Sequence, residues 1–138
     1  MPAAGQKQTV LLVDDDANFL SELNDVLVGA GFHVLAAGTG SDAQKIWAAN
    51  RRRPIDAAVI DLNLPDMAGL ELIRRIVTAR TTTRVLATTA CLSDLHLEIA
   101  GYMGAHKTIR KFPETADGFP RSEWVESVST VLKPDTSG

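Results

Sequence analysis

Three aspartates stand at the ends of two apolar runs in this sequence. Asp14 and Asp15 directly follow the run 9–13, and Asp61 directly follows the run 55–60. Near-continuous Val, Ile and Leu is typical of strands that are buried on both faces of a parallel sheet. The carboxyl ends of such strands meet at one edge, where open sheets bind their ligands. We therefore expect three carboxylates close together, a cluster that repels itself unless a cation joins it.

These residue types suit two linked kinds of chemistry. Mg²⁺ prefers octahedral oxygen ligation and keeps some of its waters, so a few carboxylates and a phosphoryl oxygen suit it. A carboxylate can also attack phosphorus and become an acyl phosphate. Asp61 stands alone at its strand end, so we interpret it as the phosphoacceptor, with Asp15 as a direct metal ligand and Asp14 as a ligand through water.

Structural explanations compete with this interpretation. The acidic pair could cap the N-terminus of a helix, but Asp16 could provide that cap alone. Asp61 could simply form a turn. Adjacent carboxylates at a strand end would otherwise destabilise the protein through like charge, so we favour metal binding.

The spacing of the apolar residues predicts five strands that alternate with five helices. The expected strands cover 9–13, 32–36, 55–61, 85–89 and 106–110. The expected helices run from Asp16 or Asn18 to Ala30, over 41–50, along the apolar stripe 70–77, over 92–103 and along the stripe 124–132. This order predicts an α/β, flavodoxin-like, doubly wound five-stranded parallel sheet of order 2-1-3-4-5, with helices on both faces.

Local signals mark the ends of the first two helices. Gly31 supplies a C-terminal stop for the first, whose apolar stripe we assign to Leu20, Leu23 and Leu27. Ser41, with Gln44 three residues later, forms a capping-box pattern that opens the second.

Length, charge and composition narrow the function classes. The 138 residues fit one domain, which we place at 9–132 between tails of 1–8 and 133–138. A net charge of −3 gives no reason to expect nucleic-acid binding by this domain. No apolar stretch approaches the roughly 20 residues of a membrane span, so we expect no membrane contact and a cytoplasmic location. The single cysteine, Cys91, excludes an internal disulfide.

The pattern as a whole resembles the receiver domain of two-component response regulators. The matching positions are Asp14 and Asp15, Asp61, Asn63, Pro65, Gly69, Thr89 and Ala90, and Lys111. The resemblance implies that the backbone carbonyl of Asn63 completes the coordination of Mg²⁺ or Mn²⁺. It also implies that Thr89 donates its hydroxyl to a phosphoryl oxygen and that the Lys111 ammonium pairs with the remaining negative charge.

The same resemblance implies a single-domain response regulator. Asp61 would receive a phosphoryl group from a sensor histidine kinase or a histidine phosphotransfer protein. Phosphorylation would then shift a two-state equilibrium at the surface built from the fourth helix, the fifth strand and the fifth helix. With no output domain in this chain, the message would pass to another effector protein. We expect no conventional enzyme, only self-catalysed phosphorylation and dephosphorylation.

The sequence departs from the family pattern after Lys111. The family usually has lysine followed by proline, joined by a cis bond that aims the lysine, whereas this chain has Lys111-Phe112-Pro113. A cis bond before Phe112 would cost about 2.5–4 kcal/mol, so we expect that bond to be trans. The long segment 113–120 follows, and we expect it to contact a specific partner.

Other functions remain as alternatives. The altered region after Lys111 allows a receiver-like binding module that works without phosphorylation. An aspartate-nucleophile phosphohydrolase of the dehalogenase type would use aspartates two apart, as Asp14 and Asp16 are, but the chain lacks its cap domain and its later acid cluster. A flavin binder would need a Ser/Thr/Gly-rich phosphate loop where this chain is acidic.

Overall fold

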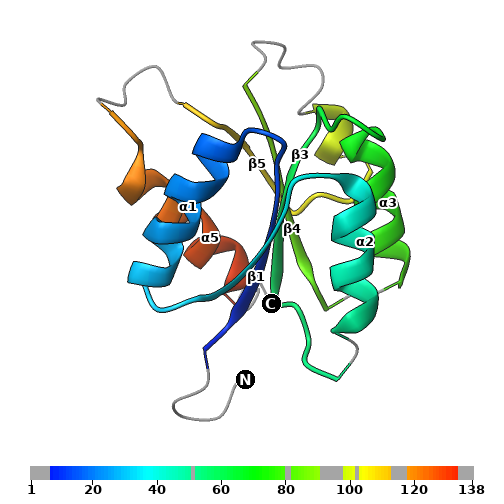
Figure 1. Cartoon of the computed structure of the whole chain (residues 1–138), viewed down its shortest axis with the longest axis horizontal. Helices are drawn as coiled ribbons and strands as arrows, with labels where there is room; N and C mark the ends of the chain where they lie inside the picture. The colour runs from blue at the N-terminus through cyan, green and yellow to red at the C-terminus, as the bar shows by residue number, and fades with distance from the viewer. Residues whose placement is uncertain are drawn as a thin grey trace, which may run out of the picture.

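A computed structural model of the chain describes residues 7–50, 52–79, 82–90, 98–101, 103–112 and 118–133. Five parallel strands form one sheet in the order β2-β1-β3-β4-β5, which confirms the predicted topology (Figure 1). The strands are β1 (Thr9–Val13), β2 (His33–Ala37), β3 (Ala57–Asp61), β4 (Arg84–Thr89) and β5 (Lys107–Arg110). Several predicted strand ends are wrong by one or two residues.

Helices cover both faces of this sheet. They are α1 (Ala17–Gly29), α2 (Gly40–Ala49), α3 (Gly69–Ala79) and α5 (Arg121–Leu132). Helices α1 and α5 lie on one face, and α2 and α3 lie on the other (Figure 1). Within the predicted helix 92–103, residues 98–101 are helical, and most of the rest falls outside the described residues.

The sheet separates two apolar cores. Every residue of β1 and β3 is buried, as expected for strands that are covered on both faces. Leu11 and Val13 of β1 point into the core beneath α2 and α3, whereas Val10 and Leu12 point into the core beneath α1 and α5. Alternate residues of β1 therefore pack against helices on opposite faces of the sheet. A shift by one residue would exchange the two sets of side chains, so this alternation fixes the register.

The two N-terminal helices begin with different caps. The Asp16 carboxylate accepts hydrogen bonds from the backbone N–H groups of Asn18 and Phe19, which confirms Asp16 as the cap of α1. The predicted capping box at Ser41 is wrong, because Thr39 caps α2. The Asp66 carboxylate accepts from the N–H groups of Gly40 and Ser41, each at 2.8 Å.

The buried stripe of α1 begins one residue earlier than predicted. It consists of Phe19, Leu23 and Leu27, and Leu20 is only partly buried. The regular spacing of four residues places these three side chains on one face of the helix.

The turn from β3 into α3 depends on a glycine. Gly69 donates its N–H to the Leu62 carbonyl at 3.1 Å, and a Cβ at this position would lie 2.6 Å from the Leu62 Cα and clash with the Asp61 carbonyl oxygen. Both obstacles are backbone atoms, so no side-chain rotation can relieve the clash. Gly69 thus fixes the backbone of Asp61 at the end of its strand.

We predict that Gly69→Ala lowers the free energy of unfolding by about 1–3 kcal/mol, because overpacking forces a backbone shift. Urea denaturation followed by circular dichroism measures the change. Gly29→Ala is the matched control, since a Cβ there meets nothing within 4 Å. Equal stability of the two variants would contradict this account of the turn.

Candidate functional site

The ends of the strands place the candidate residues at one edge of the sheet. Asp14 continues the ladder beyond β1, its N–H donating to the Ala37 carbonyl at 3.1 Å. Lys111 continues the ladder beyond β5, its N–H donating to the Thr89 carbonyl at 3.2 Å. Asp61 is the last residue of β3. Thr89 is the last residue of β4, so four neighbouring strands hold Asp14, Asp61, Thr89 and Lys111 on a rigid backbone.

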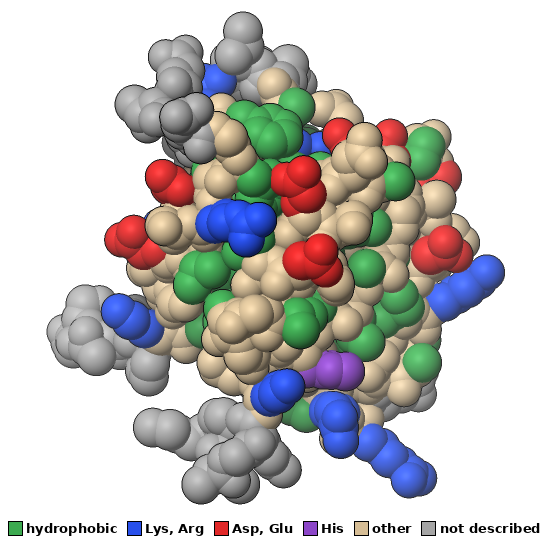
Figure 2. All heavy atoms as spheres, turned by 60° about the vertical axis from the view of Figure 1, so that its left-hand side comes forward, with side chains coloured by type: hydrophobic (Ala, Val, Ile, Leu, Met, Phe, Trp, Pro, Cys, Tyr) green, Lys and Arg blue, Asp and Glu red, His purple; other side chains and the backbone are tan. Residues whose placement is uncertain are grey.

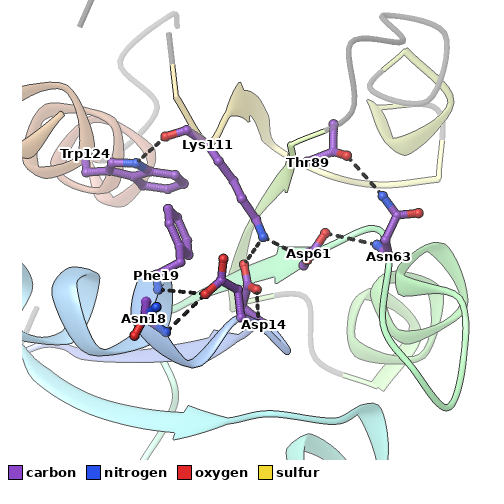
Figure 3. A network of polar contacts seen from close by, with 9 residues as sticks. Asp14, Asn18, Phe19, Asp61, Asn63, Thr89, Lys111 and Trp124 are labelled. Carbon is purple, nitrogen blue, oxygen red and sulfur yellow. Dashed lines mark hydrogen bonds and ion pairs between the residues drawn. The ribbon is translucent and has the colours of Figure 1, made fainter. Parts of the chain in front are cut away.

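A buried ammonium joins two buried carboxylates at this edge (Figure 3). Lys111 Nζ lies 2.6 Å from Asp14 Oδ2 and 3.0 Å from Asp61 Oδ2. All three residues are nearly inaccessible, with exposed fractions of 3% for Asp14 and Asp61 and 4% for Lys111. The positive charge offsets the repulsion between the two carboxylates.

In both buried carboxylates, one oxygen accepts a backbone hydrogen bond and the other contacts Lys111. Asp14 Oδ1 accepts from the N–H of Asp16 at 2.9 Å, and Asp61 Oδ1 accepts from the N–H of Asn63 at 3.0 Å. The second oxygen of each carboxylate faces Lys111. These local turns orient the carboxylates, so that the second oxygen of each points toward Lys111.

The three predicted acidic residues come together. Asp14, Asp15 and Asp61 each offer one carboxylate oxygen, and these oxygens lie within 4.8 Å of one another. Asp15 is exposed, whereas the other two are buried. Asp14 Oδ2 is buried and pairs with Lys111 Nζ at 2.6 Å. An oxygen-only set with waters entering from the exposed side fits a hard divalent cation such as Mg²⁺.

Thr89 and Asn63 meet at the other end of the site. Asn63 Nδ2 donates to Thr89 Oγ1 at 3.2 Å, and Thr89 is buried at the end of β4 (Figure 3). Sequence reasoning assigned the backbone carbonyl of Asn63 to the metal and did not link its side chain to Thr89. In the structure its side chain also holds the Thr89 hydroxyl.

Burial changes the acid–base behaviour of the site. It raises the pKa of the Asp14 carboxyl from its ordinary 3.8 to about 6, although the contacts with Lys111 and the Asp16 N–H oppose this shift. Burial would lower the pKa of Lys111, but its contacts with Asp14 and then Asp61 outweigh burial and raise that pKa above its ordinary value. Lys111 is therefore charged at neutral pH.

Aromatic residues that sequence reasoning did not assign to the site surround Lys111. Trp124 Nε1 donates to the Lys111 carbonyl at 3.2 Å, and the Phe19 ring centroid lies 4.8 Å from Lys111 Nζ. The four-residue spacing of Phe19, Leu23 and Leu27 could have placed Phe19 on the buried face, but no local signal links it to Lys111. The Lys111–Phe112 bond is trans, as predicted.

Comparison with known proteins identifies the family. The model of the response regulator receiver domain matches residues 10–117, which is more than half of the chain. The chain belongs to the response regulator receiver family. This family is a signalling family of two-component systems and not a family of conventional enzymes, so the phosphohydrolase alternative has no support.

Individual relatives agree with this assignment. The receiver is 40% identical over 88 residues to a probable transcriptional regulatory protein, TcrX, of Mycobacterium tuberculosis, covering 64% of this chain and 36% of that protein. It is 32% identical over 105 residues to the DNA-binding response regulator MtrA of Mycolicibacterium paratuberculosis, covering 76% of this chain and 45% of that protein. The receiver thus spans less than half the length of these curated relatives.

A solved structure supports the fold. The CheY-like response regulator receiver domain protein of Methanospirillum hungatei JF-1 is similar with a TM-score of 0.77 and 23% identity, and the match covers 92% of this chain and 94% of that one. At this identity the likeness concerns the fold alone. Within the described residues of the receiver, no helix has the length and apolar character needed to span a membrane.

We predict that Asp14→Asn stabilises the metal-free receiver at pH 7.5 by roughly 1–3 kcal/mol, because the folded carboxyl has a raised pKa. The native state binds more protons than the unfolded state between pH 4 and 6, so the wild-type free energy of unfolding falls as pH rises through this window. Urea titrations in EDTA at several pH values measure both effects.

The variant should lose this part of the pH dependence. Asp25→Asn, which changes an exposed aspartate of α1, is the control and should leave it unchanged. A variant that is less stable than the wild type at pH 7.5 would show that the Asp14–Lys111 attraction outweighs burial.

Proposed function

We propose that this receiver accepts a phosphoryl group on Asp61 from a phosphohistidine, with Mg²⁺ or Mn²⁺ as cofactor. The donor would be a sensor histidine kinase or a histidine phosphotransfer protein. The observation that carries the proposal is the position of Lys111 Nζ, which lies 3.0 Å from Asp61 Oδ2 in a buried site. An ammonium held there is already placed to meet the charge that a phosphoryl group brings.

The transfer is a displacement at phosphorus. An Asp61 carboxylate oxygen would attack, the bond between phosphorus and the donor imidazole nitrogen would break, and the imidazole would leave with the electron pair. Lys111 would pair with one phosphoryl oxygen, and Thr89 would donate its hydroxyl to another. These groups act by position and charge, as phosphoryl transfer requires.

Asp14, Asp15, Asp61 and the Asn63 carbonyl would hold the divalent cation. When bound, the cation would offset the negative charge of the carboxylates and of the incoming phosphoryl group. Asp15 is the exposed member of the set, so it can bind a cation without first giving up a buried contact. The direct role of Asp15 and the water-mediated role of Asp14 remain part of this proposal.

Contacts around the site provide a route to the surface. Lys111 is tied through its backbone to β4 and through its carbonyl to Trp124 of α5. A change in the position of Lys111 or Thr89 would therefore bias the packing of β5 and α5. We propose that a downstream effector protein reads this surface as a two-state switch.

Several further expectations from the sequence stay predictions. They are the single-domain form, the cytoplasmic location, the domain limits 9–132 and the partner contact of 113–120, of which residues 113–117 fall outside the described residues. Both acidic and basic side chains lie on the face shown in Figure 2.

We predict that acetyl phosphate and Mg²⁺ add one phosphoryl mass to the native chain and none to Asp61→Asn. Intact-mass spectrometry measures the gain. Asp16→Asn is the matched control, because this third acid of the run caps α1 and asparagine caps equally well. It should retain the gain.

The absence of a mass gain in the native chain, with acetyl phosphate and with a phosphorylated histidine kinase alike, would overturn the proposal. A binding module that works without phosphorylation would then be the better description.

We predict that Mg²⁺ stabilises the native chain and not Asp15→Asn. A ligand that binds only the folded state at 100 times its Kd adds about 2.7 kcal/mol to the free energy of unfolding. A Mg²⁺ titration of the thermal midpoint measures the effect, with a monovalent salt of equal ionic strength as control. Equal gains in the native chain and in Asp15→Asn would exclude Asp15 from the metal site.

A further inference from the structure

We propose that Phe19 is a positioning residue for Lys111, and that its ring face holds the ammonium between the two carboxylates. The proposal rests on the proposed function for its effect on phosphorylation. Its geometric part concerns the unphosphorylated protein and can be tested separately.

The surroundings of the ammonium motivate this assignment. A lysine ammonium has three N–H donors. The Asp14 and Asp61 carboxylates lie within 3.0 Å of Lys111 Nζ. The face of Phe19 lies on a further side, with its ring centroid 4.8 Å from Nζ. The negative face of an aromatic ring attracts a cation within about 6 Å, and more strongly where water is excluded, as it is here.

Other aromatic rings hold Phe19 in place. Phe112 and Trp124 contact it edge-on, with centroid distances of 5.6 Å each and interplanar angles of 77° and 68°. Phe119 adds a tilted contact at 5.7 Å. Such contacts favour particular ring orientations over simple apolar packing. The Phe19 ring therefore has little freedom to turn away from Lys111.

The aromatic cluster around Phe19 also contacts the backbone of Lys111. Trp124, which contacts the Phe19 ring, donates its indole N–H to the Lys111 carbonyl at 3.2 Å (Figure 3). The rings of Phe19 and Trp124 thus contact Lys111 at its ammonium and at its backbone carbonyl. These contacts add to the hydrogen bond from the Lys111 N–H to the Thr89 carbonyl, which holds the residue just beyond the end of β5.

The position of Phe112 also fits this arrangement. It is 52% exposed, although large apolar side chains usually avoid water. Its ring lies edge-on against Phe19 and also contacts Phe119 at 6.4 Å. Phe112 therefore closes the outer side of the cluster that holds Phe19 over Lys111.

The first experiment observes the free protein by NMR. Lys111 Nζ lies over the face of Phe19, so we expect the protons on the neighbouring Cε to resonate upfield of those of exposed lysines. Phe19→Leu should abolish this upfield shift. Phe32→Leu is the matched control, because Phe32 is a buried ring of the same core with no ring contact to Phe19 among the described residues. An upfield shift that survives Phe19→Leu would overturn the proposal.

The second experiment measures phosphorylation by acetyl phosphate in a double-mutant cycle. Phe19→Leu should slow the reaction about 2- to 30-fold, which corresponds to a desolvated cation–π contact. Phe32→Leu should change the rate less than about twofold, as expected for a site outside the interaction. In a Lys111→Met background, Phe19→Leu should have no further effect, because Phe19 acts through the ammonium.

Equal slowing by Phe19→Leu in both backgrounds would show a general packing role and overturn the proposal. If the native chain accepts no phosphoryl group, the proposed function fails, and the NMR comparison still decides whether Phe19 holds Lys111. The two failures are therefore distinguishable.

Discussion

The ion pair of Lys111 with Asp14 and Asp61 is the interaction on which the arrangement of the site depends. Two carboxylates are buried at the edge of the sheet, and burial is the largest of the effects that together raise the pKa of Asp14 to about 6. Loss of the Lys111 ammonium would leave both buried carboxylates uncompensated, which costs about 3–5 kcal/mol. The lysine must therefore be held with the same accuracy as the acids, and the surrounding structure supplies several contacts that do so.

The parallel sheet positions the lysine and the acids together because it fixes the backbone along the whole edge. Asp14, Asp61, Thr89 and Lys111 stand at or just beyond the ends of four neighbouring strands, and ladder hydrogen bonds extend to Asp14 and Lys111. Side-chain hydrogen bonds to Asp16 and Asn63 then orient the two carboxylates. Gly69 lets the chain turn closely against the backbone of Asp61. The sheet, the turns and the close packing at Gly69 thus all help to position the carboxylates and the ammonium of the site.

The site is also tied to elements that reach the surface. The Asn63–Thr89 hydrogen bond links the loop after β3 to β4, and Trp124 links the Lys111 carbonyl to α5. Asp66 in the same loop holds the first N–H groups of α2. Because packed elements rearrange between discrete states, a charge change at Asp61 has physical routes to distant surfaces.

The sequence alone determined the strand order, the two-sided burial of the sheet and the three acids at its edge. These follow from local signals, because apolar runs define buried strands and their ends define the edge. It also predicted the trans bond before Phe112, which is a local backbone preference. Tertiary structure decided the cap of α2, the burial of Phe19 against Lys111, the Trp124 contact and the raised pKa of Asp14. The Asp66 carboxylate, for example, reaches Gly40 across 26 residues of sequence. Such contacts join residues far apart in the chain, so no local spacing encodes them, and only the packed fold brings the partners together and removes the water between them.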